Sequence, residues 1–121
     1  MAYAGKNPFK IPRPISLPGG FEAKTLAADL TITGLDSTYL ALDPGGAGRN
    51  VDLPEPIDGG WYFIANKADA AENLTIRQAD ASTTLATLNQ NDSAIVYALP
   101  DKADAAADGW ALFMIFTGSI S

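Results

Sequence analysis

Cysteine and histidine are both missing from the 121 residues of this chain. Without cysteine the chain can form no disulfide, no thiolate metal site and no thiol nucleophile. Without histidine it lacks the commonest general base and the commonest transition-metal ligand. Triads built on histidine are therefore excluded, and an enzyme made from this chain would have to use carboxylates or a lysine.

Long apolar runs are also missing. The longest uninterrupted one, at residues 110–116, is far shorter than the roughly 20 residues that a membrane-spanning helix needs. The first residues, MAYAGKNPFK, contain no apolar core of a secretion signal. We therefore predict a protein that is made in a cytoplasm and stays soluble until it assembles, with no membrane partner.

Basic residues are few, with 8 Lys and Arg against 14 Asp and Glu and a net charge of −6. Nucleic-acid binding needs basic groups for the phosphates, so no nucleic-acid partner is expected. The charge is uneven along the chain. Residues 1–24 hold four basic residues and one acid, a net charge of +3, whereas residues 25–121 hold four basic residues and 13 acids, a net charge of −9. The sequence thus describes a short basic segment attached to an acidic body.

Four of the eight prolines fall within the first 20 residues. Proline fixes φ and has no N–H donor, so this stretch is expected to be extended, close to polyproline II, and neither a helix nor a central strand. A terminus is often a disordered tail, but a mere spacer would not need the apolar residues that lie between these prolines. We therefore predict an arm, residues 1–24, that grips a partner. Its expected contact residues are Lys6, Pro8, Phe9, Lys10, Ile11, Pro12, Arg13, Pro14, Ile15 and Leu17.

Residues 25–121 contain short runs of alternating apolar, β-branched and aromatic residues that are separated by turn signals such as DPGGAG at 43–48. About eight strands at roughly 8–12-residue spacing predict an all-β fold, a single small β-sandwich or barrel-like domain of short antiparallel strands. No helical apolar period is sustained for three turns, so a helical bundle is not expected. The expected strands lie at 26–33, 38–43, 49–53, 61–66, 73–78, 83–88, 93–99 and 110–116.

A faint internal repeat connects the two halves of this domain. The triplet LTI at 30–32 recurs at 74–76, and the pair Gly-Trp at 60–61 recurs at 109–110. One interpretation is a duplication in which each four-strand half forms one sheet. The other, which we favour, is the general similarity of β-strand compositions.

The last expected strand, WALFMIF at 110–116, is apolar on both faces. Such a strand belongs in the centre of a domain or at a subunit interface. A chain of this size has little core to cover both faces, so the strand favours an oligomer, with a trimer as the expected form.

Two carboxylates, Asp52 and Glu55, are close in sequence, and a carboxylate pair can hydrolyse glycosides. With so many acids in the chain, a solvated loop stiffened by Pro54 and Pro56 is the favoured interpretation. We therefore expect no enzymatic activity and no catalytic residue.

Five further aspartates offer oxygen ligands for a hard cation such as calcium, but their spacing does not match the EF-hand pattern. Solubility at loop tips is the favoured interpretation, and we expect neither a metal nor a cofactor. These residues are Asp69, Asp80, Asp101, Asp104 and Asp108.

Four aromatic residues offer material for a sugar-binding platform. Alternation along WYFI at 61–64 directs at least half of its side chains toward the core. A core role is therefore favoured for most of the four. They are Trp61, Tyr62, Tyr97 and Trp110.

Three segments carry a resemblance to a known group of proteins: YLALDPGGAGRNVDLPEPIDGGWYFIAN at 39–66, NLTIRQADASTTLATLNQNDSAIVYALPD at 73–101 and DGWALFMIF at 108–116. Their order of strand, Asp-Pro-Gly turn, Leu-Pro strand end, aromatic strand and Gly-Trp strand resembles small β-rich virion proteins of tailed bacteriophages. The resemblance covers roughly residues 26–116. Among these proteins, the head decoration (cement) proteins are the most similar.

The resemblance implies a non-enzymatic protein of the virion that binds and stabilises the capsid surface after synthesis in the host cytoplasm. Its implied partners are the major capsid protein of the same virus and two further copies of itself in a homotrimer. The arm would supply apolar contacts, while Lys6, Lys10 and Arg13 would steer it toward acidic surfaces. The alternative is a head-fibre, tail or collar component that binds a host-surface glycan.

Overall fold

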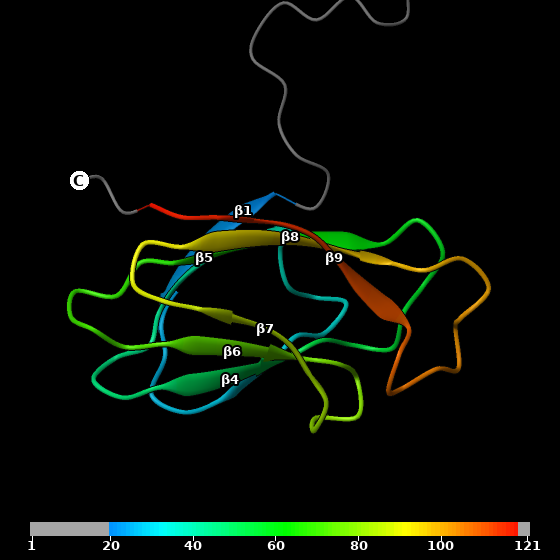
Figure 1. Ribbon diagram of the computed structural model, residues 1–121, viewed down its shortest axis with the longest axis horizontal. Helices are drawn as coiled ribbons and strands as arrows, with labels where there is room; N and C mark the ends of the chain where they lie inside the picture. The colour runs from blue at the N-terminus through cyan, green and yellow to red at the C-terminus, as the bar shows by residue number, and fades with distance from the viewer. Residues whose placement is uncertain (1–19, 119–121) are drawn as a thin grey trace, which may run out of the picture.

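The computed structural model describes residues 20–118, which form nine strands and no helix (Figure 1). Five strands make sheet A, in the order β1-β3-β5-β8-β9, and four make sheet B, in the order β2-β4-β6-β7. The predicted small all-β domain is thereby confirmed. Within this part of the chain, no helix has the length and hydropathy to cross a membrane. The strands are β1 (Phe21–Thr25), β2 (Leu30–Thr31), β3 (Tyr39–Asp43), β4 (Arg49–Asp52), β5 (Trp61–Asn66), β6 (Leu74–Arg77), β7 (Thr84–Leu88), β8 (Ser93–Ala98) and β9 (Trp110–Phe116).

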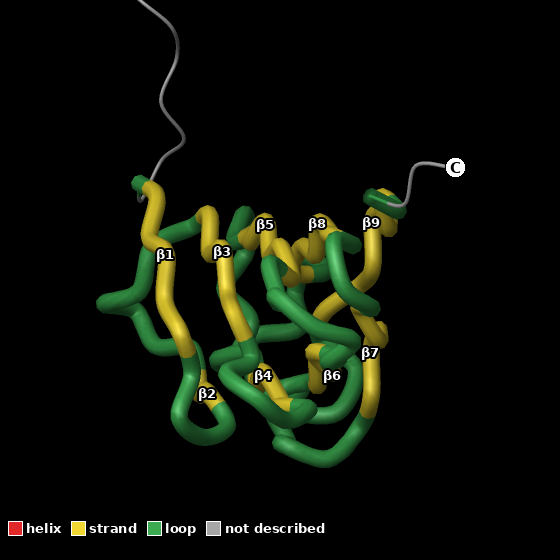
Figure 2. Tube along the Cα trace, turned by 90° about the vertical axis from the view of Figure 1, so that its left-hand side faces the viewer, coloured by secondary structure: helices red, strands yellow, loops and turns green. Residues whose placement is uncertain are grey.

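From β1 to β6 the chain moves to the other sheet at every strand. As a result β1, β3 and β5 lie side by side and parallel in sheet A, and β2, β4 and β6 do the same in sheet B. This is the topology of a short β-solenoid, in which successive turns of the chain stack on one another. Figure 2 shows the two rows of strands, with β1 and β9 at opposite ends of sheet A. Antiparallel pairing of β7, β8 and β9 completes the domain.

The prediction of antiparallel strands is wrong for the larger part of the fold, because four of the seven strand pairings are parallel. Alternation of apolar and polar residues follows from the pleat, which is the same in both kinds of sheet. What makes the strands parallel is the crossing of each connection between the layers, and the strand pattern carries no record of it.

The position of the repeated triplets does not fit a duplication with one half in each sheet. The two LTI triplets begin at Leu30 in β2 and at Leu74 in β6, and both of these strands belong to sheet B with β4 between them. In the register of that sheet, Leu30 lies opposite Val51, which lies opposite Ile76. Leu30 therefore aligns with Ile76 and not with Leu74, so the two LTI triplets share a sheet but are offset by two residues.

β1 occupies residues that the sequence assigned to the arm. Phe21 is 60% exposed, whereas Glu22 and Lys24 lie at inward positions opposite Leu40 and Leu42. Strands are usually recognised by apolar side chains on the inner face and polar ones on the outer face. This segment has the reverse arrangement, so no strand was predicted here. Within the described residues the β domain therefore begins at Phe21, and the strand expected at 26–33 is reduced to the short β2.

The core lies between the two sheets. In sheet A, Leu40 is the register partner of Ile64, and in sheet B Val51 is the partner of Ile76; all four side chains are completely buried. Burying one such aliphatic side chain contributes about 1.5–3 kcal/mol. Because neighbouring turns supply these pairs, the solenoid is held together by contacts between segments that are distant in sequence.

Candidate interaction surface

An aromatic row crosses the outward face of sheet A. It consists of Phe21 on β1, Tyr39 on β3, Phe63 on β5 and Phe116 on β9. The ring centroids of Phe21 and Tyr39 are 4.8 Å apart, those of Tyr39 and Phe63 are 4.6 Å apart and stacked, and those of Phe63 and Phe116 are 6.3 Å apart. The first three residues share one register line, so parallel stacking of the turns aligns the rings. On the outward positions of the strands in sheet A, Asp43 is the only charged residue among those the structure describes.

β9 extends this apolar surface to the edge of the sheet. Its residues from position 112 to 116 are between 36% and 62% exposed. Register places Leu112 and Ile115 on the inner face, opposite the buried Val96 and Ala94 of β8. β9 contacts β7, the last strand of sheet B, but the exposure of these two side chains shows that the core covers this part of β9 incompletely. Of the two positions considered for this strand, the centre of a domain is therefore wrong: β9 lies at an edge, with apolar side chains exposed on both faces. A subunit interface, which the sequence favoured, stays a prediction.

The opposite edge of sheet A is different in character. On β1, the Lys24 ammonium lies 3.0 Å from Asp36 and 3.5 Å from Glu22. Burial raises the pKa of Asp36, but hydrogen bonds from the Thr33 backbone and from Lys24 outweigh it, so the pKa lies below its ordinary value. Inward-pointing charges on an edge strand oppose pairing with another strand. β1 thus has a protected edge, and β9 does not.

The two carboxylates considered for catalysis have separate environments. Asp52 is buried and accepts two hydrogen bonds from Arg77, at 2.6 Å from Nε and 3.0 Å from the second guanidinium nitrogen. Hydrogen bonding to Asp52 raises the pKa of Arg77. Glu55 lies in the following loop and is exposed. Asp52 therefore holds β4 and β6 together as one half of an ion pair, and both of its oxygens are engaged.

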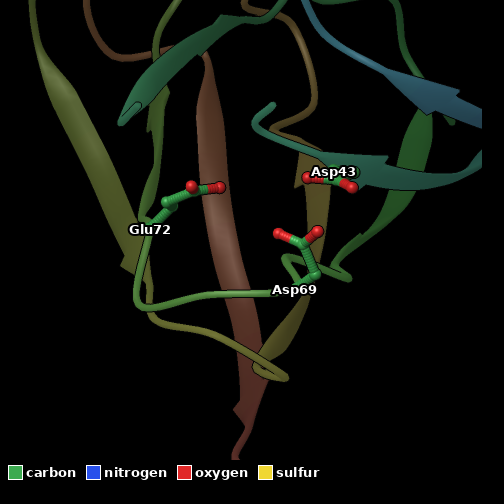
Figure 3. A group of neighbouring side chains, drawn as sticks. All are labelled: Asp43, Asp69 and Glu72. Carbon is green, nitrogen blue, oxygen red and sulfur yellow. The ribbon is translucent and has the colours of Figure 1, made fainter. Parts of the chain in front are cut away.

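A different set of acids lies close together. Asp43 at the end of β3 and the loop residues Asp69 and Glu72 have carboxylate oxygens within 4.8 Å of one another (Figure 3). Asp43 also accepts a hydrogen bond from the Gly45 N–H at 2.9 Å. The cluster offers three of the six to eight oxygens that calcium takes. Only Asp69 belongs to the aspartates weighed as cation ligands from the sequence.

Two other aspartates of that set have partners close to them in sequence. Asp80 accepts hydrogen bonds from the Thr83 hydroxyl and backbone and from the Ser82 N–H, and these bonds lower its pKa. Asp108 pairs with Lys102 at 3.2 Å on the surface. Asp80 thus stabilises the local backbone of its turn, whereas Asp108 contributes a surface ion pair.

A cleft of about 310 Å³ lies between the loops that precede β3 and β5, next to the first residues of β5 and β9. Trp61, Tyr62 and Trp110 line it together with Asp36 and Glu55. The Trp110 indole donates to the Pro54 carbonyl at 2.7 Å, and burial raises the pKa of Tyr62.

Of the aromatic residues weighed as a sugar platform, Trp110 is buried in the core, as favoured from the sequence, while Tyr97 is exposed on β8. Trp61 and Tyr62, which line the cleft together with Trp110, are partly exposed.

The ten residues predicted as arm contacts, from Lys6 to Leu17, lie outside the described residues.

The aromatic row was not predicted as a unit, because its members come from four separate strands. Only the repeated Tyr and Phe at outward strand positions signalled it.

Comparison of the chain with models of protein families, with curated proteins and with solved structures found no match.

Proposed function

We propose that this chain is a non-enzymatic structural protein of a phage virion that binds and stabilises the capsid shell, with its arm gripping a neighbouring subunit. The observation that carries the proposal is the outward face of sheet A. Across five strands it presents aromatic and aliphatic side chains that are exposed on the edge strands and mostly half-buried on the central ones, and Asp43 is its single charged residue. Large apolar patches on small proteins mark interaction sites.

The proposed occupant of this face is another protein surface. The aromatic row is held on paired strands, so little side-chain entropy is lost when it is covered. Aromatic anchors of this kind provide most of the binding energy in protein interfaces. A decoration protein binds its shell in many copies, so modest affinity at each site is sufficient for stabilisation.

Shell binding is tested with the full-length protein and expanded shells that lack it. Phe63→Thr and Phe21→Thr keep strand propensity but remove two rings of the aromatic row, and we expect shell affinity to fall at least about tenfold. Leu35→Thr, at a residue that is 98% exposed in a turn, is the matched control and should bind as the parent does. Equal occupancy of shells by all these proteins, measured by sedimentation, would refute the proposal. Thermal unfolding verifies that each variant is folded.

A second candidate function is supported by the aromatic cleft. Trp61 and Tyr62 offer rings for stacking, and Glu55 offers a carboxylate for sugar hydroxyls. This arrangement fits a head-fibre, tail or collar component that binds a host-surface glycan. Binding of the parent protein to host envelope but not to shells, with loss in Trp61→Ala, would favour this function over shell binding.

A further inference from the structure

The prolines of the arm all occupy positions of one parity. Pro8, Pro12, Pro14 and Pro18 are even-numbered, whereas the apolar residues among them are all odd-numbered. In an extended strand, the N–H and C=O groups of alternate residues point to the same edge. In that conformation residues 9–17 would have a complete set of hydrogen-bonding groups on their odd edge, while Pro12 and Pro14 would interrupt the donors of the other edge. The odd positions are Phe9, Ile11, Arg13, Ile15 and Leu17.

Such a segment is suited to be the last strand of a sheet. Proline is tolerated on edge strands where its missing N–H faces solvent, and there it prevents further strands from adding. Side chains alternate with the same period of two, so the four apolar residues also share one face. The segment can pair on one edge, cover apolar surface with one face and protect the resulting edge.

β9 has the features of an acceptor for such a strand. It lies at an edge of sheet A, contains neither a charge nor a proline, and exposes Leu112 and Ile115 on the side where sheet B ends. The other edge strand, β1, carries the inward charges of Glu22 and Lys24. We propose that residues 9–17 of one copy add as an edge strand to β9 of a second copy, with their apolar side chains over Leu112 and Ile115.

The acceptor must belong to another copy for the whole segment to pair. β1 and β9 are separated by the three strands β3, β5 and β8, so sheet A places them roughly 19 Å apart at about 4.8 Å per strand. Leu17 precedes Phe21 by four residues, which reach about 14 Å when fully extended. Leu17 therefore cannot reach the β9 of its own chain.

The proposed contact is heterologous, because the arm of one copy meets a different surface of the next. Contacts of this kind close into a ring when the rotation allows it. The trimer expected from the sequence is one such ring. In this arrangement the neighbouring subunit that the arm grips is a second copy of the same chain. The arrangement holds whether or not the oligomer then binds a shell.

Two proline substitutions in the full chain test the parity. Ile15→Pro removes an N–H from the pairing edge, whereas Ser16→Pro adds a proline to the blocked edge. Light scattering over a range of concentrations measures the self-association of each protein. We expect the parent and Ser16→Pro to form the same oligomer and Ile15→Pro to dissociate at a concentration roughly tenfold higher or more. Ile15→Ala separates loss of the side chain from loss of the donor and should dissociate less than Ile15→Pro.

A monomeric parent at all concentrations, or equal self-association of Ile15→Pro and Ser16→Pro, would overturn the proposal. A peptide of residues 7–19 provides a second measurement on the parent protein, because it should compete for β9 and lower the oligomer mass. If the peptide leaves the mass unchanged at saturating concentration, β9 is not the acceptor. Shell binding is read separately: an oligomer with the expected proline pattern that fails to bind shells would refute the proposed function and leave this inference standing.

Discussion

At the scale of single residues, the turn after β3 depends on two adjacent glycines with positive φ. Gly45 has φ 78° and Gly46 has φ 102°. A Cβ on Gly45 would collide with the Leu26 carbonyl oxygen, whereas a Cβ on Gly46 would have no neighbour within 4 Å. The Asp43 carboxylate accepts the Gly45 N–H and so fixes the start of the turn. The sequence DPGGAG predicted a turn here, and the structure adds the reason why its first glycine has no substitute.

Alanine at these two glycines separates the cost of the backbone conformation from the cost of the collision. We expect Gly46→Ala to lower the free energy of unfolding by about 1–2 kcal/mol, the usual penalty for a side chain in the left-handed region. Gly45→Ala should lower it further, by roughly 1–3 kcal/mol more, because the turn must also move away from the Leu26 carbonyl. Urea unfolding at neutral pH measures both. Equal losses would show that the Leu26 carbonyl moves away without cost.

At the scale of elements, one side chain connects β9 to the end of the other sheet. The buried Gln78 amide donates to the Trp110 carbonyl at 2.8 Å and accepts from the Trp110 N–H at 3.0 Å. It thereby pairs with the first residue of β9 as a backbone strand would. Trp110 is the only fully covered residue of that strand, so this contact anchors β9 at one end while the rest is exposed. Sequence position alone offered no sign that residue 78 has this role.

Removing the Gln78 amide should therefore lower the free energy of unfolding by more than the loss of a single hydrogen bond would. Gln78→Ala leaves two buried backbone groups of Trp110 unpaired, and each such group costs about 1–3 kcal/mol, so we expect a loss of roughly 2–4 kcal/mol. Gln90→Ala is the matched control, because Gln90 makes one partly exposed bond to the Ala68 carbonyl at 3.1 Å and should cost well under half as much. Denaturant unfolding gives both values. A loss for Gln78→Ala no larger than the control's would contradict the anchoring role.

At the scale of the whole molecule, stability depends on ionised carboxylates that accept hydrogen bonds. The pKa of Asp29 is lowered by the Asn50 backbone N–H and side chain, that of Asp80 by Thr83, and that of Asp36 by Thr33 and Lys24 against the effect of burial. Each group binds a proton more weakly in the folded chain than in the unfolded one. Lys24 has the opposite shift, because its hydrogen bond to Asp36 raises its pKa.

The sign of these shifts predicts acid destabilisation. Groups with a lowered pKa contribute fully above their unfolded pKa of about 3.9, and the contribution is lost as the pH falls through the folded pKa. We therefore expect the Tm to be steady from pH 7 to about pH 5 and to fall progressively below it. Calorimetry between pH 7 and pH 2.5 measures this. Asp80→Asn should be less stable at pH 7 and show a smaller decline, and a parent Tm that is constant or higher at pH 3 would contradict the shifts.

The alternation of apolar residues was sufficient to predict an all-β domain and most of its strands. At 61–66 the expected strand and β5 have the same bounds, because side chains alternate across a pleated strand whatever its neighbours are. The Asp-Pro-Gly turn and the core role of Trp110 were predicted for equally local reasons. β1 was missed because its inward residues, Glu22 and Lys24, are charged and its outward Phe21 is apolar.

Only the tertiary structure decided how the strands are combined. Parallel pairing, the stacking of Phe21, Tyr39 and Phe63, and the edge position of β9 all depend on where connections cross between the sheets. The acidic cluster of Asp43, Asp69 and Glu72 depends on it too. The sequence by itself determined most of the segments that become strands, β1 being the exception, since that choice rests on local alternation and turn chemistry. It did not determine their neighbours, because pairing is set by contacts between residues far apart in the chain, and no local pattern records them.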